Sequence, residues 1–250
     1  MRKSPVEIVA TAGTRAAGVS GLRTGRFGRW ADGVTAMRAD CAAFAHYWHG
    51  HNERVAGRAG PLWVVLGDST AQGLGAPSPY GGYVGQVLAG LRERTGEQWQ
   101  VLNLSKSGSV LGDVMKAQLP RVPADAALVT CGVGMNDILY TAPGKLFADL
   151  RELVASVPDG TVLLDLPVPA GVWGVIGRAS VPYVARINRV LHQAAAQRGL
   201  TVARVSDQFR SPWRGKFAKD NFHPSQDGYR DWTRALLAAI PANLTAAVAS

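Results

Sequence analysis

The sequence has few cysteines and no long apolar runs, and each shortage excludes a class of protein. Two cysteines, Cys41 and Cys131, cannot form a disulfide framework, so both are expected to be free thiols. No stretch approaches the roughly eighteen consecutive apolar residues of a membrane-spanning helix. The N-terminus lacks the apolar core of a secretion signal, because Glu7 and Arg15 interrupt it. We therefore expect a cytoplasmic protein.

Acidic residues are also scarce. The chain has 27 Lys and Arg against 18 Asp and Glu, a formal net charge of +9. Apart from a small group between Arg15 and Arg29 the arginines are scattered, and there is no zinc-finger spacing or RNA-binding aromatic motif. We expect no nucleic-acid partner. One weaker alternative stays open: the basic N-terminal arm could contact an anionic membrane surface.

The first sixty residues differ in composition from the rest. Residues 1–60 are interpreted as a basic arm followed by a packing helix, in which apolar residues from Val34 to Trp48 recur at three- and four-residue steps. His46, His49 and His51 lie in this helix and are expected to be exposed, with metal binding as a weaker alternative. Residues 61–250 are expected to form the main domain.

After residue 60, apolar strand patterns alternate with helical patterns. The strand candidates are 62–66, 98–104, 126–131, 160–166 and 200–205. The helix candidates are 83–94, 111–119, 143–157, 181–198 and 226–240. This alternation predicts an α/β fold with a parallel, doubly wound sheet of about five strands. The stretch 167–182 is rich in proline and glycine and is expected to be a loop over the site.

The first strand candidate ends in glycine, a carboxylate and a hydroxyl: Gly67, Asp68 and Ser69. Ligands bind outside the carboxyl ends of strands in such sheets, so Ser69 could serve there as a nucleophile. Serine is also a common helix N-cap, and this structural alternative stays open. Asp68 and Asp137 are interpreted as loop braces rather than catalytic groups.

Other strand ends and late loops supply partners for a serine nucleophile. A serine hydroxyl needs an imidazole to take its proton and a carboxylate to orient that imidazole. His223 and Asp220, three residues apart, can share one turn and fit these roles. The backbone N–H groups of Ser69 and Gly108 and the side-chain amide of Asn136 could stabilise an oxyanion.

These residues occur in four blocks, 67–69, 103–108, 134–137 and 220–223, and in this order the chain resembles the SGNH (GDSL-type) hydrolase family. The resemblance spans about residues 62–240. It implies a flavodoxin-like three-layer α/β/α fold and an enzyme without metal or organic cofactor. The family includes esterases, lipases, thioesterases and carbohydrate deacetylases. Thr70 stands where the name-giving motif has leucine, a departure that only flanks the nucleophile.

The resemblance also implies roles for the individual residues. Ser69 would be the nucleophile, Asp220 and His223 would complete the triad, and Gly108 and Asn136 would form the oxyanion hole with the Ser69 amide. We expect a serine hydrolase that cleaves a short-chain carboxylic ester, with a small acyl ester or an acylated lipid or sugar as substrate. The alternatives are an acyltransferase on the same triad and a non-catalytic binding module on this fold.

Overall fold

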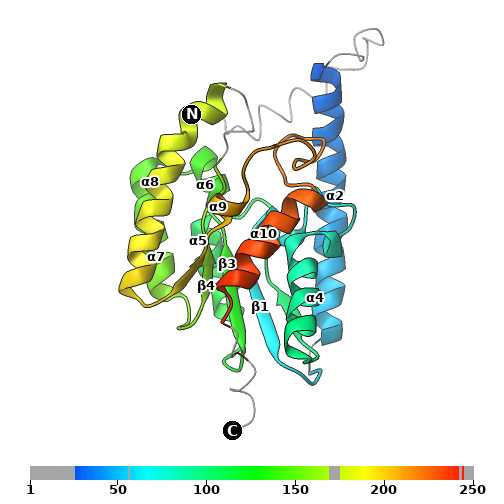
Figure 1. The fold of residues 1–250 in the computed structure, drawn as a ribbon, viewed down its shortest axis with the longest axis vertical. Coiled ribbons are helices and arrows are strands. Elements are labelled where there is room, and N and C mark those ends of the chain that lie inside the picture. Colours follow the sequence, from blue (N-terminus) through cyan, green and yellow to red (C-terminus); the bar gives the residue numbers. More distant parts are fainter. Residues whose placement is uncertain (1–25, 56, 169–174, 242–243, 245–250) are drawn as a thin grey trace.

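The computed structural model describes residues 26–55, 57–168, 175–241 and 244 of the chain (Figure 1). Its centre is a five-stranded sheet in the order β2-β1-β3-β4-β5, and every pair of neighbouring strands is parallel. The strands are β1 (Leu62–Gly67), β2 (Gln100–Asn103), β3 (Leu128–Gly132), β4 (Val162–Leu164) and β5 (Thr201–Ala203). The predicted α/β fold with five parallel strands is confirmed, and the strand order is that of flavodoxin-like proteins.

Helices connect the strands and cover both faces of the sheet. Before and after β1 lie α2 (Arg26–Val55), α3 (Ser69–Gln72), η1 (Pro79–Gly81) and α4 (Tyr83–Thr95). Between β2 and β4 lie α5 (Leu111–Asp113), the π-helical turn η2 (Val114–Gln118), η3 (Leu119–Arg121), α6 (Met135–Tyr140) and α7 (Pro143–Ser156). The last part contains α8 (Val175–Gln197), α9 (Val205–Gln208) and α10 (Gln226–Ala239).

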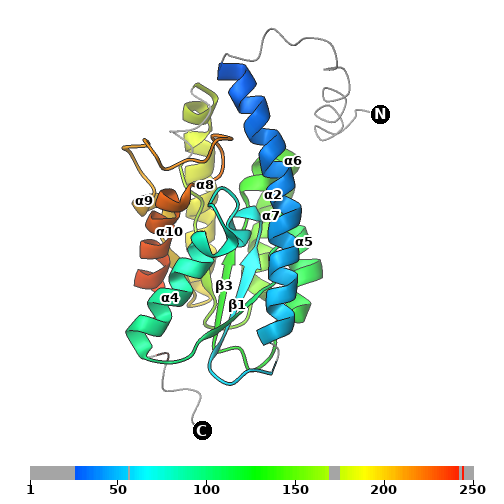
Figure 2. The ribbon, with the colours of Figure 1, turned by 90° about the vertical axis from the view of Figure 1, so that its right-hand side faces the viewer.

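Alternate residues of β1 enter two different apolar cores, as expected for a strand that is covered on both faces. Trp63 and Val65 pack in a core with residues of α4 and α10. Val64 and Leu66 pack in a second core with residues of α7 and α8. None of these four side chains is exposed to solvent. The three-layer arrangement can be followed in Figures 1 and 2.

The register of the central strands determines where the polar loops meet. Gly67 at the end of β1 pairs with Gly132 at the end of β3, so both strands end at the same level. Ser69 and Asn136 follow these two ends after a few residues. Two segments that are far apart in the sequence therefore reach one edge of the sheet.

The predicted loop over 167–182 is wrong in its second half. Helix α8 begins at Val175, six residues before the predicted start, and Pro182 lies inside it. Proline favours the first turn of a helix, which is why the pattern predicted a start at residue 181. Pro182 has no N–H, so the Arg178 carbonyl lacks the hydrogen bond that a helix normally provides there. Residues 169–174, with Trp173, lie outside the described residues.

The predicted packing helix is confirmed as part of α2, which runs along the molecule beside the edge of the sheet (Figure 2). His51 is not exposed as predicted. It is buried, and its Nε2 lies 3.0 Å from the Val101 carbonyl oxygen on edge strand β2. Burial lowers the pKa of His51. The arm before residue 26 lies outside the described residues, and the division into residues 1–60 and 61–250 stays a prediction.

Cys41 and Cys131 are both free thiols, as expected. Among the helices of the described residues, none combines the length and the apolar character that crossing a bilayer requires.

Candidate active site

The turn after β1 brings Ser69 to the carboxyl edge of the sheet. A Cβ atom at Gly67 would lie 2.6 Å from the Gly132 carbonyl oxygen, so only glycine allows the two strand ends to approach this closely. Asp68 is the N-cap of α3, and its Oδ1 accepts hydrogen bonds from the Thr70 backbone N–H (2.9 Å) and hydroxyl (2.8 Å). The capping role therefore belongs to Asp68, which leaves the Ser69 hydroxyl available.

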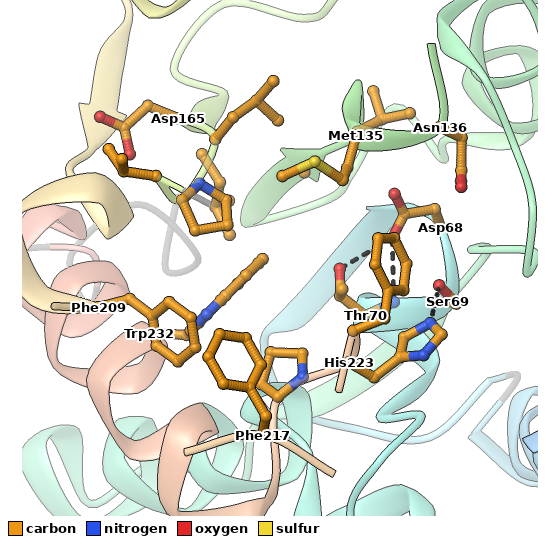
Figure 3. Close-up of a pocket in the computed structure, with 18 residues that line it drawn as sticks. Asp68, Ser69, Thr70, Met135, Asn136, Asp165, Phe209, Phe217, His223 and Trp232 are labelled. Carbon is orange, nitrogen blue, oxygen red and sulfur yellow. Dashed lines mark hydrogen bonds between the residues drawn. The ribbon is translucent and has the colours of Figure 1, made fainter. Parts of the chain in front are cut away.

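Ser69, His223 and Asp220 form one hydrogen-bonded chain, of which Figure 3 shows the contact between Ser69 and His223. The Ser69 Oγ lies 2.8 Å from His223 Nε2, and His223 Nδ1 lies 2.6 Å from Asp220 Oδ2. All three residues are buried, with exposed fractions of 6 to 8%. This is the geometry in which an imidazole can take a proton from a serine hydroxyl while a carboxylate fixes its tautomer.

A tight turn holds Asp220 and His223 in this arrangement. The second carboxylate oxygen of Asp220 accepts the backbone N–H groups of Phe222 (3.0 Å) and His223 (3.1 Å). Asn221 takes a left-handed conformation with φ of 54°, which asparagine tolerates better than most residues. Burial would raise the pKa of Asp220, but the hydrogen bond and charge of His223 hold it below its usual value. Asp220 therefore stays ionised near neutral pH.

Besides the Ser69 N–H, the expected oxyanion donors come from the loop after β2 and from the first turn of α6. Asn136 lines the same pocket as Ser69 and His223, and its Nδ2 donates one hydrogen bond to the Ser109 carbonyl oxygen (2.9 Å). The second N–H of this amide remains available for a ligand. Gly108 precedes Ser109 in a turn closed by the Ser109 N–H and the Lys106 carbonyl (3.1 Å), although Gly108 itself does not line the pocket.

Gly108 is favoured by its backbone conformation rather than by crowding. Its φ is 81°, and a Cβ atom there would meet no other atom of the chain within 4 Å. Toward the other described residues, the backbone N–H groups of Ser69 and Gly108 donate no hydrogen bond. Both groups are thus free to donate to a substrate.

Three polar side chains that were not singled out as site residues brace these loops. Gln118 accepts the Gly67 N–H and donates to the Gly67 carbonyl, both at 2.8 Å. Gln72 donates to the Ser105 carbonyl (3.0 Å), and Asn103 donates to the Ala71 carbonyl (2.8 Å). All three are buried. Gln118 ends a π-helical turn, a feature that often marks functional sites, but this turn is visible only in the structure.

Asp137 braces the same region, as the sequence predicted. Its Oδ2 accepts the Leu111 backbone N–H (3.0 Å) and its Oδ1 accepts the Thr141 hydroxyl (3.0 Å). This carboxyl has no exposed surface, and burial raises its pKa to about 6. Asp137 therefore ties the start of α5 to α6 without reaching the reacting groups.

An apolar pocket extends from Ser69 and His223 into the body of the molecule. Figure 3 shows Phe209, Phe217 and Trp232 on the side away from Ser69. Further apolar walls come from the end of β4 and from the segment after it: Leu164, Leu166, Pro167 and Val168. Phe217 thus lines the pocket, whereas Trp213 packs behind it against Phe209 and Phe217.

A second histidine and carboxylate lie beside this pocket. Asp165 lines it, and the Asp165 carboxylate accepts the Ser206 backbone N–H (2.8 Å), the Ser206 hydroxyl (2.6 Å) and His192 Nε2 (3.2 Å). The serine bonds to the carboxylate and not to the imidazole, so this cluster lacks the order of a nucleophile and its base. His192 therefore has a structural role.

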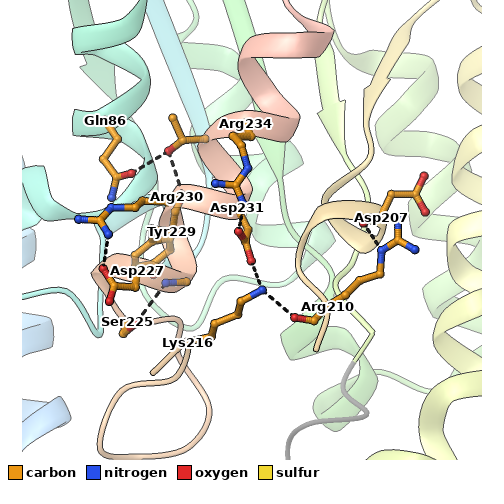
Figure 4. Close-up of polar contacts among 12 residues, drawn as sticks. Gln86, Asp207, Arg210, Lys216, Ser225, Asp227, Tyr229, Arg230, Asp231 and Arg234 are labelled. Atoms are coloured by element: carbon orange, nitrogen blue, oxygen red, sulfur yellow. Dashed lines mark hydrogen bonds and ion pairs between the residues drawn. The ribbon is translucent and has the colours of Figure 1, made fainter. Parts of the chain in front are cut away.

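An ion pair joins the loop between α9 and Asp220 to α10 (Figure 4). Lys216 Nζ lies 2.5 Å from Asp231 Oδ2 and donates to the Arg210 carbonyl (2.7 Å), while Arg234 contacts the other Asp231 oxygen. The Asp231 side chain is only 4% exposed. The next residue, Phe217, forms an isolated antiparallel bridge with Pro224. This anchor thus supports both the pocket wall and the turn that carries His223.

Within the ranges that the structure describes, no three His, Cys, Asp or Glu side chains gather closely enough to hold a metal ion.

The model of the GDSL-like lipase/acylhydrolase family matches residues 65–230, about two thirds of the chain. This chain belongs to that family. Its members hydrolyse esters, so the protein is an ester-hydrolysing enzyme of the GDSL group. The matched segment begins within β1 and ends within α10, and it leaves α2 outside. No curated protein sequence matches the chain.

Solved structures of other hydrolases share the fold of this GDSL-family enzyme. A lipase from a goat rumen metagenome is 20% identical with a TM-score of 0.60, and the match covers 74% of this chain and 99% of that one. An acetylxylan esterase of Geobacillus stearothermophilus, solved as a catalytic mutant, is 20% identical, with coverage of 74% and 96% and a TM-score of 0.58. Phospholipase A1 of Streptomyces albidoflavus is 20% identical, with coverage of 72% and 100% and a TM-score of 0.53.

Proposed function

We propose that this enzyme hydrolyses carboxylic esters through an acyl-enzyme on Ser69, with His223 as the general base and Asp220 orienting it. The observation that carries the proposal is the continuous hydrogen-bonded chain from the Ser69 hydroxyl to the Asp220 carboxylate. A binding module would gain nothing from an imidazole oriented in this way beside a serine. The ionised state of Asp220 supports the role of stabilising a protonated His223.

The reaction has two steps. Ser69 Oγ attacks the ester carbonyl while His223 Nε2 takes the hydroxyl proton and then passes it to the leaving alcohol. Water then attacks the acyl-enzyme, His223 takes a proton from that water, and the proton returns to Ser69 as the acid leaves. The negative oxygen of each intermediate is stabilised by the Ser69 and Gly108 N–H groups and the Asn136 amide.

The apolar pocket supports an acyl chain as the group recognised beside Ser69. Phe217, Phe209 and Trp232 offer apolar surface and few hydrogen-bonding groups, which suits a hydrocarbon better than a sugar. We infer that the acyl chain of a short-chain ester occupies this pocket and that the alcohol leaves on the open side.

The direct test measures hydrolysis of p-nitrophenyl esters, from acetate to long acyl chains, by the wild type and by Ser69→Ala. Ser78→Ala is the matched control, because Ser78 is an exposed helix cap away from the pocket. Activity should be lost in Ser69→Ala, by about 10⁴-fold or more, and retained in Ser78→Ala. Hydrolysis that survives Ser69→Ala would assign the nucleophile to another residue. Absence of hydrolysis in the wild type would contradict the esterase assignment for these substrates.

A further inference from the structure

Helix α2 lies outside the segment that matches the family, yet it binds the edge strand from which the Gly108 loop leaves. Strand β2 has β1 on one side only. The N–H groups of Gln100 and Leu104 point toward β1, where they donate to Pro61 and Val65. Alternate residues of a strand point their backbone groups to opposite sides. The backbone groups of Val101 and Asn103 therefore face away from the sheet and need other partners.

Asn52 of α2 supplies these partners at Asn103. Its Nδ2 donates to the Asn103 carbonyl oxygen (2.7 Å), and its Oδ1 accepts the Asn103 N–H (3.0 Å). One side-chain amide thus satisfies both outward backbone groups of this residue, as a neighbouring strand would. The backbone of Asn103 is held in place by a residue of α2.

The side chain of Asn103 carries this constraint into the site. Its Nδ2 donates to the Ala71 carbonyl (2.8 Å) in the short helix that begins with Ser69. Its Oδ1 accepts the Ser105 N–H (3.1 Å) and hydroxyl (2.5 Å). Asn103 therefore joins the helix of the nucleophile to the start of the loop that leads to Gly108.

A second contact of α2 reaches the same loop. Trp48 Nε1 donates to the Gln72 carbonyl (2.9 Å). The Gln72 side chain donates a hydrogen bond to the Ser105 carbonyl oxygen (3.0 Å) and accepts one from the Ser107 hydroxyl (2.5 Å).

We infer that α2 sets the position of the Gly108 loop relative to Ser69, with Asn52 as the principal positioning residue and Trp48 as the second. This inference rests on the proposed function, in which the Gly108 N–H stabilises the oxyanion. An oxyanion donor acts mainly on the transition state, so a displaced loop lowers kcat and leaves substrate binding nearly unchanged.

The test compares Asn52→Leu with His51→Leu in the full-length chain. Both variants remove hydrogen bonds between α2 and β2, but His51 contacts Val101 and has no bond to the network around Asn103. Asn52→Leu should lower kcat about tenfold, with KM changed less than about twofold. It should weaken inhibition by an alkylboronic acid, whose serine adduct mimics the tetrahedral intermediate, by a similar factor. His51→Leu should lose stability and keep kcat.

Two further measurements provide a readout that does not depend on activity and a second variant in case the first does not fold. Hydrogen–deuterium exchange should rise in residues 104–110 of Asn52→Leu and stay unchanged in β3, and this readout does not depend on activity. If Asn52→Leu does not fold, Trp48→Phe decides the question, because it keeps an aromatic ring in the core and removes the donor to Gln72. It should lower kcat about threefold and speed exchange in the same loop.

Wild-type kcat and unchanged exchange in Asn52→Leu would overturn the inference, as would an equal loss of kcat in His51→Leu. An inactive wild type, or an active Ser69→Ala, would instead contradict the proposed function. The exchange measurement would then be the test of the role of α2.

Discussion

The two sides of the Ser69 pocket are built from opposite kinds of side chain. Near the nucleophile, the backbone is held by buried amides such as Gln72, Asn103 and Gln118. On the far side, Phe209, Phe217 and other apolar residues form the walls. Hydrogen bonds are directional and fix backbone groups closely, whereas apolar contacts tolerate changes of shape. Substitutions on the polar side should therefore affect the rate, and those on the apolar side should affect the choice of substrate.

Asp220→Asn should produce the largest effect on the polar side. An asparagine can no longer hold the His223 tautomer that accepts the Ser69 proton, so kcat should fall about 10⁴-fold with little change in KM. Steady-state kinetics on the best p-nitrophenyl ester measure both constants. Asp149→Asn is the control, because this buried carboxylate pairs with Lys145 and does not line the pocket. It should destabilise the protein and keep kcat within a few fold; equal losses in both variants would contradict the role of Asp220.

Phe217→Ala should have the next largest effect and should change selectivity rather than rate. Removal of this ring enlarges the apolar pocket, so the acyl chain with the highest kcat/KM should become longer. The ratio of kcat/KM for the longer ester to that for the original best ester should rise about tenfold. Phe147→Ala, in which a ring packed on Tyr183 is lost, should leave this ratio unchanged. An unchanged profile in Phe217→Ala would place the acyl chain elsewhere.

Asp137→Asn should have the smallest effect, which appears as a change in how stability depends on pH. Burial raises the pKa of Asp137 from 3.8 to about 6 in the folded chain, so between these values the folded state binds more protons than the unfolded state. The free energy of unfolding therefore falls as pH rises from about 4 to about 6, by at most about 3 kcal/mol. Urea unfolding at several pH values should show that the free energy of unfolding changes less with pH in Asp137→Asn than in the wild type. The same pH dependence in both proteins would contradict this assignment.

Local patterns were sufficient to predict the strands and several of the residues that lie together at the candidate site. The apolar run of β1 is buried on both faces, and such runs carry their own signal. Asp220 and His223 lie three residues apart, so one turn brings them together without help from distant segments. Ser69 and Asn136 meet because neighbouring parallel strands end at one level, a consequence of the fold class.

Long-range contacts could not be predicted in this way. Asn52 acts through the backbone of Asn103, and Gln118 through the backbone of Gly67, so neither residue has a local pattern that indicates its partner. The sequence does not show that His51 lies beside the free edge of β2. Its side chain was therefore expected to be exposed. The start of α8 was predicted too late because proline is typical of the first turn of a helix. In the structure the helix begins at Val175 and Pro182 lies inside it.

The most direct test of the central claim is covalent labelling with a fluorophosphonate, followed by mass spectrometry of the intact protein and of its peptides. Such reagents react with a serine whose hydroxyl is activated by a neighbouring base. The account predicts one adduct per chain, located on Ser69, and strongly reduced labelling in His223→Ala. Labelling of another residue, or equal labelling in His223→Ala, would contradict the assignment of Ser69 as a nucleophile activated by His223.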